Sequence, residues 1–506
     1  MRLSHSVALC LLLFLPSAAR ADDIGPEQAQ TLQQQLKDWL AGLLGPTVKL
    51  PDMPWRITGE HDHYQLTWPI PGVENPADNL AVTASIRPLD GGRWSIDDVK
   101  APPAAKFTVT VPDKTDDLTT GSPMKVAYTI GTQDTHAAID PTLATPSTLH
   151  VDIGAIAVTA DNAKQHQEQH IDRNLADATL QPTQNGRLDL TTDGTMEGWK
   201  SAASVNGGQA MAIAAKSIHA TGRIEGVSRD RAAALLAASG ALFGALPPDM
   251  MRKGSKAELP PPAKAQLRLV IAALQGVMTA ASMRETVDGL QVEIAGRGAM
   301  AVQHLQIGFG GEAPDGKLHA WFDIGLDGLN SPTLPPKIAA YLPQHIEIQP
   351  SLSGVQTADL AKLATDATEG AADDRFSSDI AALFAHGGAV IGIETLSFDL
   401  GPAKVEGTGR VTMSSPSTWN GVAHLSATGL DDLMTQARTN PDLQQAVPVL
   451  IVLRGLAKPD GGRLVWDIVS DGPSVIVNGL DLSQLTGGGK PKAKPPGAQP
   501  GQPPSR

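Results

Sequence analysis

Alternation of apolar and polar residues is the main pattern along this chain, and it predicts strands that each have one buried face. In the stretch DGKLHAWFDIGLDG, residues 315–328, every second side chain is apolar, which is the period of a half-exposed strand. The apolar positions of this stretch are Leu318, Ala320, Phe322, Ile324 and Leu326. The same alternation recurs at residues 107–111, 290–294, 305–309, 393–398 and 464–468.

Asx-Gly pairs, the strongest short signal for a hairpin turn, occur eleven times. Asp-Gly pairs begin at residues 90, 193, 288, 315, 327, 460 and 471, and Asn-Gly pairs begin at residues 185, 206, 420 and 478. We therefore expect consecutive antiparallel strands joined by tight turns, with one apolar sheet face.

Apolar residues at helical spacing predict fewer helices than strands. An amphipathic helix is expected within residues 22–46, from Pro26 to the helix breakers Gly45 and Pro46. Further helices are expected at residues 229–246, 266–283, 358–367, 374–385 and 431–438. Because these helices interrupt the strands instead of alternating with them, the pattern favours an α+β, mostly β fold. The predicted architecture is a long curved antiparallel sheet, or several sheets, of hairpins and meanders with a few packed helices.

A weak internal repeat is visible in the second half of the chain. Val270–Gly276 resembles Val449–Gly455, and each segment is followed by a turn and an apolar strand. We interpret residues 216–350 and 351–485 as two diverged copies of one strand-and-helix unit, with chance similarity in a Gly- and Ala-rich chain as the alternative. Residues 47–215 then form a β-rich region, and the Gly-, Pro- and Lys-rich residues 486–506 form a disordered tail.

Residues 1–21 have the three parts of a cleaved secretory signal peptide. Arg2 supplies the positive start, residues 7–15 the short apolar stretch, and Ala19-Arg20-Ala21 the cleavage site. Cys10, the only cysteine, leaves with this segment, so the exported chain uses neither disulfides nor thiol chemistry. The residues around Cys10 argue against a lipoprotein anchor.

The net charge argues against some classes of partner. The formal charge of −13 becomes about −15 when Arg2 and Arg20 are removed, because two positive charges and no negative ones are lost. Nucleic acid is not expected as a partner, since phosphate binding needs a basic face. After the signal peptide, no segment has the roughly 18 uninterrupted apolar residues of a membrane-spanning helix.

Several long segments resemble a known family. They are LKDWLAGLLG at 36–45, LPQHIEIQPSLSGV at 342–355, and the stretches 383–416 and 427–468. Together they are similar to the secreted alphaproteobacterial proteins of domain-of-unknown-function family 2125, which has no established activity. The strands that lead into Gly-Leu-Asp at 429–431 and 479–481 are distantly similar to periplasmic AsmA-like envelope proteins. Those are long curved sheets whose apolar face is thought to carry lipid, so the resemblance implies a Gram-negative periplasm and a mostly β fold.

Two histidine clusters are the candidate metal sites. On a strand, His166, Glu168 and His170 point the same way and bring together three side chains of the types that bind zinc, and a helix would also bring His166 and His170 close. Their neighbours are all polar, which equally fits a solvated strand face. His61 and His63, expected on one face of a strand, form a second, smaller candidate that needs further ligands from elsewhere.

Candidate catalytic residues are sparse. His319 and Asp323 share the polar face of the strand at 317–327, close to Trp321, where they form either an acid-base pair or an ordinary polar contact. Nucleophile elbows, dinucleotide loops and phosphate loops are missing from the sequence, and no cofactor is expected. A catalytic triad built from distant residues leaves no sequence signature.

The sequence therefore predicts a periplasmic, non-enzymatic envelope protein that binds or carries a lipid or another hydrophobic ligand along an apolar sheet face. The residues expected to face this ligand are Leu318, Ala320, Phe322, Ile324 and Leu326. The main alternative is a structural scaffold that holds envelope proteins through its sheet edges. A hydrolase with a triad that is not visible in the sequence is the third possibility.

Overall fold

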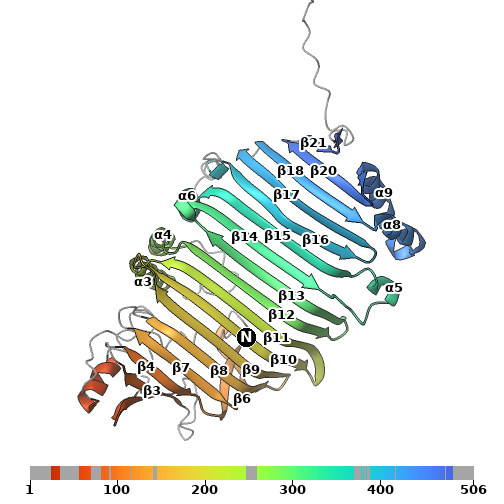
Figure 1. Cartoon of the computed structure of the whole chain (residues 1–506). Helices are drawn as coiled ribbons and strands as arrows, with labels where there is room; N and C mark the ends of the chain where they lie inside the picture. Colours follow the sequence, from red (N-terminus) through yellow and green to blue (C-terminus); the bar gives the residue numbers. More distant parts are fainter. Residues whose placement is uncertain are drawn as a thin grey trace, which may run out of the picture.

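The computed structural model describes residues 24–34, 56–69, 81–89, 93–114, 117–140, 145–246, 259–369, 378, 380, 383–384, 388–415, 418–472 and 474–482. The described strands form one long, open antiparallel sheet, and short helices lie along its sides (Figure 1). This architecture confirms the predicted α+β, mostly β fold. The predicted signal peptide at residues 1–21 and the predicted tail at 486–506 lie outside the described residues.

The N-terminal end of the sheet has two branches that both join strand β8. One branch runs in the order β1, β2, β3, β4, β7, and the other consists of β5 and β6. These strands are β1 (Arg56–Glu60), β2 (His63–Pro69), β3 (Ala81–Pro88), β4 (Trp94–Lys100), β5 (Ala104–Lys114), β6 (Asp117–Thr129) and β7 (Gln133–Asp140).

A compact core forms on the first of these branches. A helix over residues 26–34 places Ala29 and Leu32 against the strands, where they pack with Ile86, Trp94 and Ile139. These side chains are almost completely buried. Residues 35–46 of the predicted N-terminal helix lie outside the described residues.

The middle of the sheet consists of long strands, each paired with the next in the chain. They are β8 (Thr145–Asp161), β9 (Gln165–Pro182), β10 (Leu188–Val205), β11 (Gly208–Val227), β12 (Ala280–Ile294), β13 (Gly298–Glu312), β14 (Lys317–Asp327), β15 (Pro343–Gln356), β16 (Ala389–Leu400) and β17 (Ala403–Ser415). Their length follows from alternation that continues over 11 to 20 residues.

The C-terminal end adds short strands and a helical layer. The strands are β18 (Thr418–Thr428), β19 (Lys458–Asp460), β20 (Arg463–Asp471), β21 (Ser474–Val477) and β22 (Leu480–Asp481). Between β18 and β20 lie helix α8 (Leu430–Thr439), the 3-10 turn η3 (Pro441–Ala446) and helix α9 (Val447–Leu456). Leu450 and Leu456 of α9 pack with Leu464 and Trp466 of β20 in a second buried cluster.

The other helices also lie in connections between neighbouring strands. Helices α3 (Arg229–Ala245) and α4 (Pro261–Leu274) join β11 to β12, and α6 (Thr357–Glu369) follows β15. The 3-10 turn η2 (Pro314–Gly316) and the short helix α5 (Pro336–Ala339) precede β14 and β15. Figure 1 places α3, α4 and α6 along one side of the sheet and α5, α8 and α9 along the opposite side.

The helices α3, α6 and α8 agree with the predicted ranges, whereas the helix predicted at 266–283 was right up to Leu274 and wrong beyond it. Helix α4 ends at Leu274, because Gly276 adopts φ +67°, a left-handed conformation that terminates helices, and strand β12 then starts at Ala280. Of the predicted helix at 374–385, the structure describes residues 378, 380, 383 and 384, which are helical, and the other positions lie outside the described residues.

A line of irregular residues crosses seven neighbouring strands, and we call it the crease. Residues with positive φ lie on every second strand of this line, and ordinary residues face them on the strands between. The positive-φ members are Ala155, Gly198, Gly289 and Gly328, and the facing members are Asp172, Lys216 and Gln303.

The crease shifts the apolar alternation by one residue on each strand. In β8 the apolar series ends at Ile153 and resumes at Ile156, and in β12 it ends at Val287 and resumes at Leu290. Because an extra residue in a strand re-aims the side chains that follow it, the apolar residues stay on one face across the crease.

Only some of the Asx-Gly pairs form hairpin turns. Asn206-Gly207, Asp315-Gly316 and Asn478-Gly479 do turn the chain, with positive φ at both residues. The pairs that begin at 193, 288 and 420 instead lie inside β10, β12 and β18, and the pair at 327 ends β14. Gly289 and Gly328 serve the crease instead of a turn, so the predicted break at residue 288 was wrong.

Candidate functional site

The apolar side chains of the long strands gather on one face of the sheet, which we call the apolar face. Strand register places twelve residues in one row across β8–β18 and β20, and all but one of them are apolar or glycine. This row is Val151, Ala176, Gly194, Ala220, Glu285, Ile307, Ile324, Ile348, Leu396, Gly407, Leu425 and Trp466.

A second row beside it has the same character, with Asn174 as its single polar member. It consists of Ile153, Asn174, Met196, Ile218, Val287, Leu305, Leu326, Ile346, Phe398, Val405, Ala427 and Leu464. Together the two rows make a continuous apolar strip that runs across the strands.

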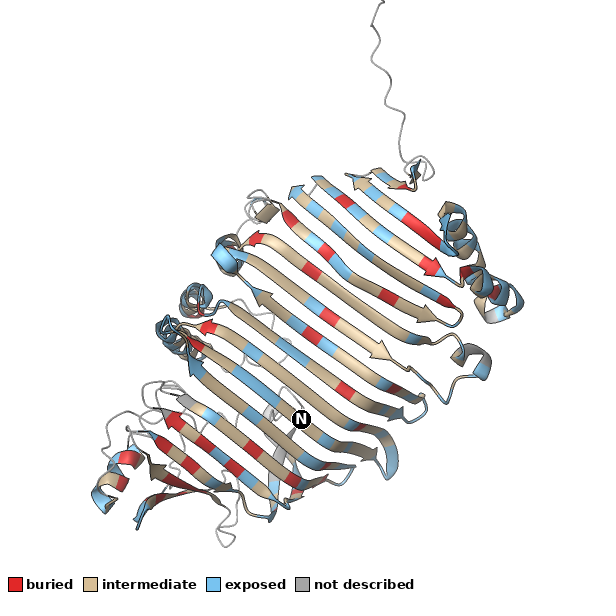
Figure 2. Ribbon diagram, viewed as in Figure 1, coloured by how far each residue is buried: buried red, intermediate tan, exposed pale blue. Residues whose placement is uncertain are grey.

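Among the residues that the structure describes, elements cover the apolar face at both ends, and none covers its middle. At the N-terminal end it meets the helix at residues 26–34, and at the C-terminal end it meets α8 and α9. In between, Phe309 is 51% exposed, and its cross-strand neighbours Met283 and Phe322 are each 38% exposed. Figure 2 shows buried residues close together in β3, β4 and β7, whereas the long strands are mostly intermediate or exposed.

The five residues predicted to face a ligand all lie on this face of β14. Phe322 pairs with Phe309, Ile324 with Ile307 and Leu326 with Leu305, so each side chain extends an apolar row. Leu318 and Ala320 continue the series toward Val355 and Leu352 of β15. The structure thus brings the predicted residues together on an open surface.

The opposite face, which we call the polar face, carries the charged side chains. Several histidines on it donate a hydrogen bond from Nδ1 to an aspartate directly across the strand pair. The pairs are His150 with Asp177 at 2.7 Å, His304 with Asp288 at 2.7 Å, His345 with Asp327 at 2.6 Å and His424 with Asp467 at 2.8 Å.

These contacts change the acidity of several groups on the polar face. The hydrogen bond from His304 is the main reason that the pKa of Asp288 lies below its ordinary value, and Ser217 adds a second bond at 3.0 Å. A bidentate contact with Arg173 lowers the pKa of Asp152 in the same way. The polar face is therefore held by pairs of complementary charge.

The first predicted metal cluster lies on the polar face, where Glu168 and His170 line a hollow. His166, Glu168 and His170 are alternate residues of β9, as predicted, and each histidine contacts a carboxylate. Asp161 accepts a hydrogen bond from His166 and raises its pKa, while Asp172 lies 2.9 Å from His170. Within the part of the chain that the structure describes, no group of three or more His, Cys, Asp or Glu side chains is arranged to hold a metal ion.

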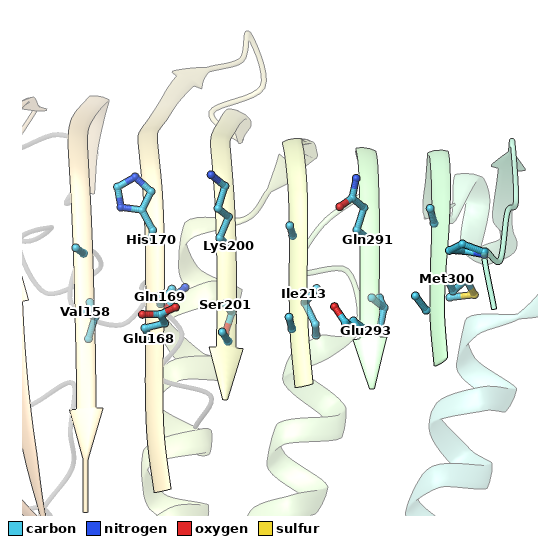
Figure 3. Close-up of a pocket in the computed structure, with 18 of the residues that line it drawn as sticks. Val158, Glu168, Gln169, His170, Lys200, Ser201, Ile213, Gln291, Glu293 and Met300 are labelled. Atoms are coloured by element: carbon cyan, nitrogen blue, oxygen red, sulfur yellow. The ribbon is translucent and has the colours of Figure 1, made fainter. Parts of the chain in front are cut away.

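The hollow itself has a volume of 820 Å³ and spans β8 to β13. Figure 3 shows His170 beside Lys200 on the neighbouring strand, with Gln291 farther along. Glu168 and Glu293 line the other side, and six of the other lining residues are alanines. Sequence analysis did not single out Lys200, Gln291 or Glu293, because only strand register brings them together.

The other two predicted sites, the pair His61 and His63 and the residue Asp323, lie elsewhere in the sheet. His61 lies in the turn between β1 and β2, and His63 begins β2, so the two do not share one strand face. His63 contacts Asp62 at 2.9 Å. On β14, Asp323 is buried and accepts a hydrogen bond from Gln306 at 2.5 Å. Its nearest cation is Arg284 at 3.7 Å, which makes Asp323 a structural partner on the polar face.

No family model, curated protein or solved structure matches the chain. The resemblance to family 2125 and to AsmA-like proteins therefore stays a prediction from the sequence. Among the helices that the structure describes, none has both the length and the apolar character that a membrane crossing requires.

Proposed function

We propose that this chain is a non-enzymatic periplasmic envelope protein that binds or carries a lipid or another hydrophobic ligand along its apolar face. The observation that supports the proposal most strongly is the pair of apolar rows, continuous over twelve strands and uncovered in the middle. Monomeric soluble proteins rarely leave large contiguous apolar surfaces exposed unless these surfaces bind something.

The dimensions of the uncovered region suit an acyl chain. From β9 to β16 there are seven strand spacings, which at about 4.8 Å each give about 34 Å. This length exceeds the hydrocarbon thickness of a whole bilayer, about 30 Å, so an acyl chain from a single leaflet fits within it. Each methylene that leaves water on this surface contributes about 0.8 kcal/mol.

The composition of the strip favours a ligand with little polar structure. Apart from Glu285, Asn174 and Trp466, whose indole N–H donates a hydrogen bond to the Leu453 carbonyl at 2.9 Å, the two rows offer only apolar side chains and glycines. Such a surface recognises apolar area and imposes little orientation, which suits acyl or polycyclic ligands better than polar substrates.

Uptake of a fluorescent fatty acid by the purified mature chain tests this proposal. The wild-type protein should bind the fatty acid in the micromolar range or tighter, and Phe322→Asp or Phe309→Asp should weaken binding at least tenfold. A charge at either position lies in the middle of the uncovered strip, while the exposure of both side chains leaves the fold intact.

Val422→Asp is the matched control, because Val422 is 60% exposed and lies on the polar face of β18. This variant should bind the fatty acid like the wild type. Absence of uptake by the wild type, or equal loss in the Val422→Asp control, would contradict ligand binding on the apolar face.

A structural scaffold is the second candidate, and strand β5 is the observation that favours it. Among the described strands, β5 pairs only with β6 along its eleven residues, so one edge is open to strand addition. If the fatty acid does not bind, the scaffold predicts that envelope proteins co-purify with the chain. Placing prolines in β5 should then abolish this co-purification.

A further inference from the structure

The polar face contains a second hollow, distinct from the one in Figure 3. It has a volume of 560 Å³ and lies over β9 to β14, on the other side of the crease. Strand register arranges its side chains in two parallel rows. One row is Thr179, Thr191, Arg223, Ser282, Gly310 and Trp321, and the other is Asp177, Asp193, Thr221, Arg284, Gly308 and Asp323.

Trp321 forms the floor of this hollow at one end. A Cβ atom added to Gly310 would lie 2.7 Å from both Cε2 and Cζ2 of the indole and 2.9 Å from its Nε1. Nearly equal distances to adjacent ring atoms mean that the ring lies directly above the Gly310 backbone. Gly308 is the next small residue under the ring, with a corresponding distance of 3.2 Å to Cζ3.

Two glycines on β13 therefore let an indole lie against the sheet on the polar face. Any larger residue at position 310 would displace the ring. Because the inner surface of the indole faces the backbone, its outer surface faces the hollow that Trp321 lines. An aromatic ring held in this way is a rigid apolar platform within polar surroundings.

The polar groups beside this platform are held in place and remain available to a ligand. Asp177 accepts a hydrogen bond from His150 at 2.7 Å, and Asp193 lies 3.8 Å from His219. Arg223 contacts Glu225 at 2.7 Å. Each of these carboxylates and guanidiniums has further acceptor or donor positions free to bind hydroxyl groups, since a carboxylate accepts about four hydrogen bonds and a guanidinium donates five.

We infer that this hollow is a binding site for the hexopyranose rings of an oligosaccharide. A pyranose ring has an apolar C–H face, which matches the indole, and a rim of hydroxyl groups, which match the alternating carboxylates, guanidiniums and threonine hydroxyls. The two arginines, Arg223 and Arg284, each lie beside a carboxylate, Glu225 and Asp323, and Asp177 and Asp193 add negative charge. The site therefore has no excess of positive charge, which suits a neutral sugar better than a phosphate or a polyanion.

The site extends beyond one sugar ring. Its two rows cross six strands, and five spacings of about 4.8 Å give about 24 Å, enough for several linked rings lying across the strands. The site lies on the face opposite the apolar strip, so it is independent of lipid binding, and both faces can be occupied at once.

Isothermal titration calorimetry of the mature chain with cellotetraose, maltotetraose and chitotetraose tests the inference. At least one of these sugars should bind with a Kd below the millimolar range. Trp321→Ala should weaken that binding at least tenfold, Trp321→Phe should retain part of it, and Asp193→Asn should weaken it several-fold without removing the platform.

Trp419→Ala is the matched control, because Trp419 is a half-buried tryptophan on the apolar face of β18. It should bind the sugar like the wild type. Urea unfolding midpoints identify any variant that has lost its fold, and Asp193→Asn then carries the test if Trp321→Ala does not fold. No heat from any of the three sugars at millimolar concentration, or wild-type affinity in folded Trp321→Ala or Asp193→Asn, would overturn the inference.

Discussion

The N-terminal branch and the long middle strands use the same alternating pattern but bury it to very different extents. In the branch formed by β1–β4 and β7, the helix at residues 26–34 covers the apolar side chains, and Ile86 is 2% exposed. In the middle of the sheet no described helix covers Phe309, which is 51% exposed. Apolar alternation therefore identifies a strand face, whereas burial depends on whether another element covers that face.

The two regions should differ most in how much free energy of unfolding is lost when an apolar side chain is truncated. Ile86→Ala should lower the free energy of unfolding by about 3 kcal/mol, because it leaves a cavity in a packed core. Phe309→Ala should cost about 1 kcal/mol, since half of its surface is already in water. Urea unfolding of both variants measures the difference, and equal costs would mean that the middle of the apolar face is covered as completely as the core.

The crease provides the next contrast, between two glycines with positive φ. Gly198→Ala should destabilise the fold by about 2 kcal/mol, because its φ is +63° and the new Cβ would overlap the carboxylate of Asp172. Gly207→Ala should cost about 1 kcal/mol, since its φ is +77° but no atom lies within 4 Å of the new Cβ. Thermal or urea unfolding compares them. A smaller loss at Gly198 than at Gly207 would contradict the close approach across the crease.

The smallest expected effect is a dependence of stability on pH that arises from a charged pair on the polar face. The hydrogen bond from His304 lowers the pKa of Asp288 from its ordinary value of 3.8. A carboxyl with a lowered pKa in the folded state stabilises the fold above its unfolded pKa, and this contribution is lost as pH falls through the folded value. The loss should therefore appear below about pH 4.

Urea midpoints between pH 2.5 and 7 measure this effect. In Asp288→Asn, the decrease of the urea midpoint at acidic pH should be smaller than in the wild type. Asp460→Asn, at the exposed end of β19, serves as the control and should keep the wild-type profile. An unchanged acid profile in Asp288→Asn would show that the pair with His304 does not contribute to stability.

The strands themselves could be predicted from the sequence, because alternation is a local property. Leu318 to Leu326 were expected on one face of a strand, and they lie on one face of β14. The crease was also visible in principle, as the change from odd to even apolar positions between Ile153 and Ile156. It was missed because Asp288-Gly289 has the composition of a turn, and a left-handed glycine serves equally in a turn and inside a strand.

Other features depend on pairings between distant segments and could not be predicted. Helix α9 was not expected, because Val449–Leu453 is a short continuous apolar run, which periodicity alone does not distinguish from a buried strand. The platform formed by Trp321 requires Gly310 on the neighbouring strand, and only the register of β13 with β14 brings them together. For the same reason, the hollow with Lys200 and Gln291 has no local sequence signal.

Native mass spectrometry of the chain, expressed with its predicted signal peptide, purified without detergent and combined with organic extraction, tests the central claim most directly. Ligand binding on the apolar face predicts a co-purified lipid or other hydrophobic molecule in stoichiometric amount, which Phe322→Asp removes and Val422→Asp retains. A clean apo mass for the wild type, with no uptake from added lipid vesicles, would contradict the claim and leave the open edge of β5 as the feature to pursue.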